Sequence, residues 1–283
     1  MYSVASTQAK NNPVYSEVIA AAEVRAAELD VPVQWGTMRS WSPRKISGLN
    51  ISCQGEAIFS DTAEFIERGH YVVNPESVLS IGDRSVLKRS SIEIIGKRCG
   101  IFIGPMCRIS EVKIRLEHDD CIVVIGKRTT WESGSLICDR GRMVVLGEDC
   151  MFSNAVLLRT SDGHGIFSPR GELLNPPADI IISPHVWLGN GVRINKGTKI
   201  PTGSIIGQGS VVSGALKKPH YIYGGTPAKP IRGPVNWGRR YEFDSVPERF
   251  RCLNEAFDDE TNPGVSGRII DATRRWLSKI TTT

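Results

Sequence analysis

The chain has 283 residues, with 35 Lys and Arg against 30 Asp and Glu, and carries a formal net charge of +5. This modest charge has no long basic block behind it, which disfavours a nucleic-acid groove and favours anionic small molecules or acidic glycans. Seven cysteines form no CxxC pair and indicate reduced thiols rather than a disulfide framework. Neither an apolar run long enough for an integral membrane segment nor a signal-peptide pattern is present, so we expect a cytoplasmic protein.

Residues 1–50 are expected to form an N-terminal helix and a linker arm. The stretch from Pro13 to Val31 is rich in Ala and Glu, starts with a proline suited to a first helical position, and is ended by Pro32. The Trp, Ser, Pro and Gly content of the residues that follow is typical of a linker. We expect this arm to pack on the rest of the chain or to clasp neighbouring subunits.

Residues 51–233 are expected to form a parallel β-helix. From Ile51 to Ile137 a six-residue beat of aliphatic residues is present but interrupted, and from residue 182 it runs without a slip (Ile182, Leu188, Ile194, Ile200, Ile206, Val212). A period of six fits neither an α-helix nor a meander, but it suits a coil of three flat sides in which Gly relieves the corners. At about 18 residues per coil the sequence predicts an all-β solenoid of roughly nine coils.

The beat breaks once between two regular blocks, from Thr160 to Asp179. This insertion and its start hold polar residues among Gly and Pro (Arg159, Asp162, His164, Arg170, Glu172). A solenoid tolerates insertions at its corners, so function can be placed there at little cost to the core. His164 is the candidate general base because a neutral imidazole titrates near the right pH, although a loop histidine is more often an ordinary surface residue.

Trp187 follows the insertion and is expected to point outward. Its neighbours Val186 and Leu188 occupy the two inward positions of the coil. A solvent-facing Trp on a flat β face usually covers something, either another subunit or a bound molecule.

Residues 234–283 are expected to form a C-terminal helical cap or tail. Ser245 to Glu248 has the signature of a helix start, and an apolar stripe at helical spacing follows (Ile269, Ile270, Thr273, Trp276, Leu277, Ile280). A stack of coils has exposed edges at both ends, which makes terminal caps necessary.

Four short segments together resemble the hexapeptide-repeat acyltransferases, and within them the bacterial capsule (sialic acid) O-acetyltransferases. They are Thr160 to His164, Val186 to Gly189, Pro227 to Lys229 and Asn236 to Arg239. The resemblance implies a left-handed β-helix that forms a homotrimer with active sites shared between subunits. It implies acetyl transfer from acetyl-CoA to a sugar hydroxyl of a bacterial surface polysaccharide or its precursor.

The resemblance also assigns expected roles to particular residues. His164 would deprotonate the acceptor hydroxyl, and Trp187 would form a wall of the acetyl or acceptor site. Asp162 could orient the imidazole, although a turn-forming role is equally compatible and a backbone carbonyl could serve instead. Asn154 is a possible second donor to the oxyanion, beside backbone N–H groups.

Coenzyme A would bind along the last coils. Its pantetheine arm is expected beside backbone amides near Gly207, Gly209 and Gly225, and its phosphates beside clustered cations (Lys217, Lys218, Lys229, Arg232), each of which alone is more often a solvated charge. A metal site would have to pair His164 with His185. We expect none, because no His-x4-His spacing exists in the sequence.

Two alternatives to polysaccharide acetylation stay open. The acceptor could be small, such as a free sugar, an amino sugar or a xenobiotic. The chain could also be a non-catalytic β-helical scaffold in which His164 is idle.

Overall fold

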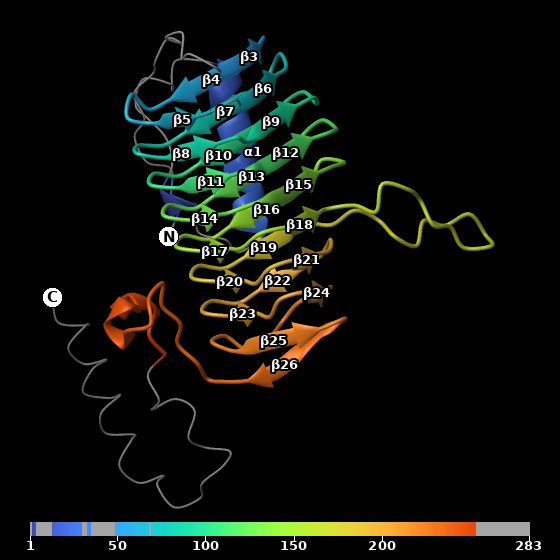
Figure 1. Cartoon of the computed structure of the whole chain (residues 1–283). Helices are drawn as coiled ribbons and strands as arrows, with labels where there is room; N and C mark the ends of the chain where they lie inside the picture. Colours follow the sequence, from blue (N-terminus) through green and yellow to red (C-terminus); the bar gives the residue numbers. More distant parts are fainter. Residues whose placement is uncertain (1, 4–12, 30–32, 35–48, 68, 253–283) are drawn as a thin grey trace, which may run out of the picture.

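The computed structural model describes residues 2–3, 13–29, 33–34, 49–67 and 69–252. Their main feature is a parallel β-solenoid whose three sheets form the sides of a prism (Figure 1). Each coil gives one strand to each sheet in turn, in the order sheet 1, sheet 2, sheet 3. The predicted solenoid of hexapeptide repeats is confirmed.

The three sheets contain the following strands. Sheet 1 contains β3 (Leu49–Cys53), β6 (Gly69–Val73), β9 (Ser91–Ile94), β12 (Val112–Leu116), β15 (Gly134–Cys138), β18 (Val156–Arg159), β21 (Arg193–Ile194) and β24 (Val211–Val212). Sheet 2 contains β4 (Glu56–Phe59), β7 (Val78–Ile81), β10 (Gly100–Ile103), β13 (Ile122–Ile125), β16 (Met143–Leu146), β19 (Ile180–Ile182) and β22 (Lys199–Ile200). Sheet 3 contains β5 (Glu64–Ile66), β8 (Val86–Lys88), β11 (Arg108–Ser110), β14 (Thr130–Trp131), β17 (Met151–Phe152), β20 (Trp187–Leu188), β23 (Ile205–Ile206), β25 (Ile222–Gly225) and β26 (Ala228–Arg232). A separate pair joins β1 (Tyr2–Ser3) to β2 (Val33–Gln34).

The described strands make seven complete coils and a partial eighth, so the expected number of nine is too high. The reason is the length of the early coils. Gly100 pairs with Ile122, a step of 22 residues, whereas Ile181 pairs with Lys199, a step of 18 residues. The early coils therefore use more residues at their corners than a strict hexapeptide count assumes.

The core of the prism is a continuous stack of inward-facing side chains. The six aliphatic residues of the regular block are buried, as their spacing predicts. Lower in the stack Trp131 and Phe152 meet edge to face, with ring centroids 5.5 Å apart. At the corners, buried hydroxyls bond to the next coil, as where Ser77 and Ser85 donate to carbonyl oxygens at 2.9 Å.

The N-terminal helix α1 (Pro13–Glu28) covers the outer face of sheet 2 (Figure 1). Val18, Ala22 and Ala26 recur every fourth residue and are buried against outward-facing apolar residues of the sheet (Ile58, Val78, Phe102, Ile122, Val124, Met143, Val145, Ile181). Small side chains at two of these three positions let the helix lie close to the sheet. The predicted helix is confirmed, and it packs on the solenoid.

Beyond sheet 3 the chain returns along the solenoid as a segment that we call the C-terminal strap, residues 234–252. It contains two short 3-10 turns, Phe243–Ser245 and Glu248–Phe250, in place of the helix start expected near Ser245. The apolar stripe predicted from Ile269 to Ile280 lies outside the described residues. Within the described part of the chain, no helix combines the length and apolar character needed to span a bilayer.

Candidate functional site

The insertion that carries His164 leaves the prism at the corner between sheets 1 and 2. It starts after β18, returns at β19, and extends away from the solenoid (Figure 1). Across it the register partners Val144 and Ile180 are 36 residues apart, against 21 residues for Ile122 and Met143 in the preceding coil. The insertion therefore adds a loop to one coil without disturbing the stacking of the strands on either side.

The loop is exposed, but its own hydrogen bonds fix its shape. The Asn175 side chain donates to Asp162 Oδ2 at 2.7 Å and to the His164 carbonyl at 2.9 Å, and it accepts from the Ile166 N–H at 2.6 Å. Lys196, on the next coil, binds Asp162 Oδ2 at 2.5 Å and the Asn175 carbonyl at 2.8 Å. One amide side chain thus holds the backbone on both sides of His164.

Two carboxylates anchor the ends of this loop to the solenoid. At its start, buried Asp139 accepts a hydrogen bond from Ser161 Oγ at 2.7 Å. At its end, Asp179 accepts from the Met143 N–H at 2.7 Å and from Arg25 of α1 at 3.1 Å. The N-terminal helix therefore contacts the loop that carries the candidate base.

The His164 imidazole has no hydrogen-bond partner among the described residues, and its side chain is exposed. Asp162 does not bond to it. Hydrogen bonds from Lys196 and from Asn175 instead hold the pKa of the Asp162 carboxyl below its ordinary value. In this structure Asp162 shapes the loop, and the imidazole is left free to meet another molecule.

Trp187 and Asn154 lie on other sides of the prism. Trp187 points outward from β20 with 36% of its surface exposed, while Leu188 is buried, as predicted. Asn154 lies exposed at the corner between sheets 3 and 1, where its carbonyl accepts from the Gly191 N–H at 2.9 Å. Because the loop leaves from the corner opposite sheet 3, one chain does not bring His164 to Trp187 (Figure 1).

Gly207 and Gly209 lie at the corner between sheets 3 and 1 of the last coils, and Gly225 ends β25 beside them. Their N–H groups already donate within the chain, to Tyr223 O at 2.8 Å, Asn190 O at 2.8 Å and Ser210 Oγ at 3.1 Å respectively. A Cβ at Gly209 would meet nothing within 4 Å. This corner thus offers open space, with its amide hydrogens already used.

The four predicted phosphate-binding cations are all exposed, and they lie at both ends of β25. Lys217 and Lys218 precede that strand, and Lys218 Nζ lies 5.0 Å from the centre of the Tyr221 ring. On the antiparallel strand β26, Arg232 pairs with Ile222 at the start of β25, and Lys229 pairs with Gly224 near its end. Only Lys229 therefore lies beside the glycine corner.

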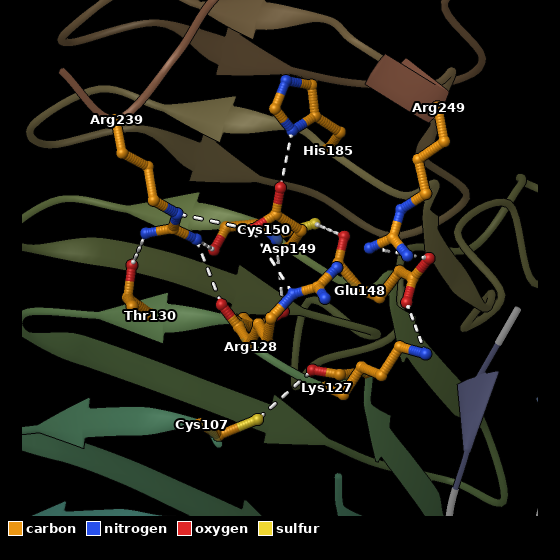
Figure 2. Close-up of polar contacts among 12 residues, drawn as sticks. Cys107, Lys127, Arg128, Thr130, Glu148, Asp149, Cys150, His185, Arg239 and Arg249 are labelled. Atoms are coloured by element: carbon orange, nitrogen blue, oxygen red, sulfur yellow. Dashed lines mark hydrogen bonds and ion pairs between the residues drawn. The ribbon is translucent and has the colours of Figure 1, made fainter. Parts of the chain in front are cut away.

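Sequence reasoning missed a polar cluster at the corner between sheets 2 and 3 (Figure 2). His185 is buried there and bonds to Asp149 Oδ2 at 2.9 Å. Arg239 of the strap reaches Asp149 Oδ1 at 3.4 Å and Thr130 Oγ1 at 2.9 Å. Burial would raise the pKa of Asp149, but the His185 hydrogen bond and the charges of Arg239 and Arg128 outweigh it and hold that pKa below its ordinary value.

The only sequence signal for this cluster was the Asn236 to Arg239 segment, whose partners lie far away in the chain. Within the residues that the structure describes, no group of three His, Cys, Asp or Glu side chains is arranged to hold a metal ion.

Comparisons with known proteins agree on one kind of relative, although no family model matches the chain. It is 30% identical over 187 residues to a polysialic acid O-acetyltransferase of Neisseria meningitidis, covering 58% of this chain and 86% of the relative. It is 38% identical over 131 residues to a polysialic acid O-acetyltransferase of Escherichia coli O1:K1 / APEC, covering 46% of this chain and 42% of that relative.

A solved structure agrees with these sequence relatives. The polysialic acid O-acetyltransferase OatWY superposes with a TM-score of 0.64 at 28% identity, covering 69% of this chain and 92% of that chain. The solenoid, the loop with its histidine and the sequence similarity thus agree with the resemblance that the motifs indicate. The chain belongs to the family of hexapeptide-repeat O-acetyltransferases that includes the polysialic acid O-acetyltransferases.

Proposed function

We propose that this protein transfers an acetyl group from acetyl-CoA to a hydroxyl of an acidic bacterial capsule polysaccharide or its precursor, with His164 as the general base. The observation that carries the proposal is the His164 imidazole itself. It is exposed and unbonded within the described chain, on a loop that Asn175 shapes and two carboxylates anchor. Use of acetyl-CoA places the reaction in the cytoplasm.

The reaction needs no covalent enzyme intermediate. His164 takes the proton of the acceptor hydroxyl as its oxygen attacks the thioester carbon. The tetrahedral oxyanion collapses, the carbon–sulfur bond breaks, and the proton passes to the departing thiolate of coenzyme A. The Asn154 side chain is proposed as one donor to that oxyanion.

The active site is proposed to lie between subunits of a homotrimer. In one chain His164 and Trp187 are on different sides of the prism, so they can face one site only if different copies supply them. The end of the loop also exposes four large apolar side chains, at 46% to 61% of their surfaces (Ile166, Phe167, Leu173, Leu174). Contiguous exposed apolar residues of this kind mark a protein contact, and a second copy of the chain is the partner that fits.

The donor is proposed to lie along the glycine corner. The open space above Gly209 accommodates the pantetheine arm, which would meet carbonyl oxygens there because the Gly207 and Gly209 N–H groups are used. Lys229, with Gly225, is placed for one end of the molecule, and Lys217, Lys218 and Arg232 are placed for its phosphates. In this proposal residues 51–233 are the catalytic domain, and residues 1–50 and 234–283 are its arms.

An acidic acceptor is supported by cations beside the loop. Arg159 and Arg193 project from the outer face of sheet 1, where Arg193 pairs with Leu157, two residues before Arg159. The Nε of Arg159 is buried and has no hydrogen-bond partner within the described chain. A sugar carboxylate at this face would satisfy it. The matched relatives are named for polysialic acid, which is such an acidic polymer.

A thiol-release assay with acetyl-CoA tests the proposal, using a panel of acidic and neutral bacterial polysaccharides, oligosaccharides and monosaccharides. We expect acceptor-dependent release by the wild type, strongest with acidic polymers, and a loss of about 10²- to 10⁴-fold in His164→Ala. Coenzyme A binding should persist in the variant. The matched control is His70→Gln, an exposed histidine of β6 that contacts Asn50 and should keep full activity. Equal turnover by wild type and His164→Ala would refute the catalytic role.

A further inference from the structure

The C-terminal strap is joined to the solenoid through a reciprocal contact between Trp237 and His185. The Trp237 indole N–H donates to the His185 carbonyl at 3.1 Å, and His185 Nε2 contacts the Trp237 carbonyl at 3.0 Å. Asn236 closes the strap on itself, because its side chain accepts from the Cys252 N–H at 2.6 Å and donates to the Cys252 carbonyl at 3.1 Å. The strap therefore meets the corner as one preformed piece.

The two ring nitrogens of His185 both face groups that can only accept. A backbone carbonyl has no proton, so Nε2 must donate to Trp237 O. Asp149 is ionised, because its pKa lies below its ordinary value, so Nδ1 must donate to Asp149 Oδ2. A neutral imidazole carries one N–H, and two donated bonds require the imidazolium form.

Two aromatic rings of the strap enclose this imidazole. Trp237 stacks on it at 4.0 Å between ring centroids with an angle of 7°, and Phe250 stacks at 4.7 Å with an angle of 12°. Two parallel rings at these distances cannot share one face, so His185 lies between them. The faces of aromatic rings attract cations, and the side chain of His185 is only 1% exposed. The strap thus supplies a cage suited to a buried cation.

Other charged and titratable groups face this corner from each element packed against it. Arg128 and Arg239 approach Asp149, and Glu148 pairs with Lys127 and with Arg249 of the strap (Figure 2). Further along the same corner lie the Cys150 thiol, whose pKa burial raises to about 12, and His220, whose pKa burial lowers. Asp149 is the anion that directly bonds to His185.

We infer that His185 is a buried imidazolium that anchors the strap, and that the strap in turn positions Trp187 through Trp237. The second half of this inference rests on the proposed function, in which Trp187 lines the site. The Trp187 and Trp237 rings lie 6.0 Å apart at an angle of 48°. The strap therefore covers one side of the outward indole and leaves the rest of Trp187 exposed. His185 and Trp237 are positioning residues, acting on the reaction only through Trp187.

The protonation state can be measured directly in the full chain. The protein has five histidines, so histidine-selective ¹⁵N labelling with single His→Gln variants assigns each imidazole, by elimination if His185→Gln does not fold. At pH 7.5 we expect both ring nitrogens of His185 to give the signals of protonated nitrogens. One bare nitrogen would overturn the inference. Asp149→Asn, which removes the anion, should move these signals toward the neutral form.

Hydrogen exchange measures the anchoring independently of any activity. His185→Gln and Trp237→Leu should each raise amide exchange across residues 234–252 by at least about tenfold, with the coils before the loop unchanged. In the wild type, exchange of the strap should rise with pH in step with loss of the second proton. His70→Gln is the control and should change neither. Unchanged protection of the strap in both variants would overturn the anchoring role.

Kinetics then test the link to Trp187. Once an acceptor is known, His185→Gln and Trp237→Leu should lower kcat/KM for that acceptor about tenfold while the KM for acetyl-CoA stays the same. An opened strap with unchanged acceptor kinetics would overturn the positioning role. If the wild type transfers no acetyl group at all, the proposed function and the positioning role both fall. The NMR and exchange measurements still decide the anchor.

Discussion

The coils before the loop and the coils after it solve the same corner problem with different residues. In both regions the chain enters the left-handed backbone region where it turns between sheets. After the loop these positions are glycines spaced six apart, Gly191, Gly197, Gly203 and Gly209, with φ between 69° and 73°. Before the loop they are charged residues spaced 22 apart, such as Glu67, Arg89 and Glu111 with φ of 63°, 48° and 50°.

The charged corners stack into ladders. Arg89 pairs with Glu67 at 2.6 Å below it and bonds to Glu111 above it at 3.1 Å between Nε and Oε1. Glycine corners form no such contacts, and the coils that use them carry Trp187 and the proposed donor corner. The difference teaches that the early coils are a scaffold stiffened from outside, while the late coils keep their surface open for ligands.

The largest effect should come from the scaffold core. Trp131 is buried in β14, and Trp131→Ala should cost about 3–5 kcal/mol in the free energy of unfolding, because it leaves a cavity. Urea or thermal unfolding measures the loss, and the folded variant should keep the kcat of the wild type at low temperature. A variant of normal stability without activity would break the division between scaffold and site.

Acid should detach the strap before it opens the early coils. Asp149 has a lowered pKa in the folded chain, so its contribution to stability is present above its unfolded pKa of about 3.9 and is lost as pH falls through the folded value. A hydrogen bond to a charged group contributes about 1.5–3 kcal/mol. Hydrogen exchange of residues 234–252 between pH 6 and pH 3 should show this release, and Asp149→Asn should remove the pH dependence.

Arg159→Gln should sharpen the assignment of the open face. If a sugar carboxylate meets Arg159, the KM for an acidic polysaccharide should rise about tenfold, or about 1.4 kcal/mol, while the KM for acetyl-CoA stays the same. Lys113→Gln is the matched control, because this cation of the same sheet pairs with Glu93 at 3.0 Å in an early coil. Equal effects of the two changes would argue for a general charge effect over a specific contact.

The smallest effect compares the corners themselves. Gly191→Ala should cost about 1 kcal/mol of unfolding free energy, because Ala is strained at its φ of 70° and its Cβ meets only atoms 4.0 Å away. Arg84→Gly changes an early corner with a φ of 54° in the opposite direction, so relief of strain should offset the gain in unfolded-chain entropy. Thermal unfolding of the pair should show the larger shift for Gly191→Ala.

The corner residues also explain how far the sequence could predict the fold. Where Gly takes the left-handed positions, the period of six is visible and the buried positions follow from it. Where charged residues such as Arg98 and Asp120 take them, the longer coil hides the period, and the coil count came out too high. The loop and the outward Trp187 could be predicted because both are local departures from the regular beat.

The polar contacts of the site could not be predicted, because they join residues far apart in the chain. His185 meets a strap residue 52 positions later, and Arg25 meets Asp179 across 154 positions. Neither contact leaves a periodic signal. The arrangement of Asp162 with Lys196, 34 positions later on the next coil, likewise depends on a stacking register that the insertion obscures in the sequence.

The N-terminal helix has a consequence for how the molecule unfolds. In a stack of coils each coil contacts only its neighbours, and such arrays fray from their ends. With 16 residues α1 is about 24 Å long, which equals about five strand spacings. It acts as a splint that fastens coils from β4 to β19 to one another. Loss of any one coil would put the helix out of register with the rest, so the splint makes the solenoid unfold as a single cooperative unit.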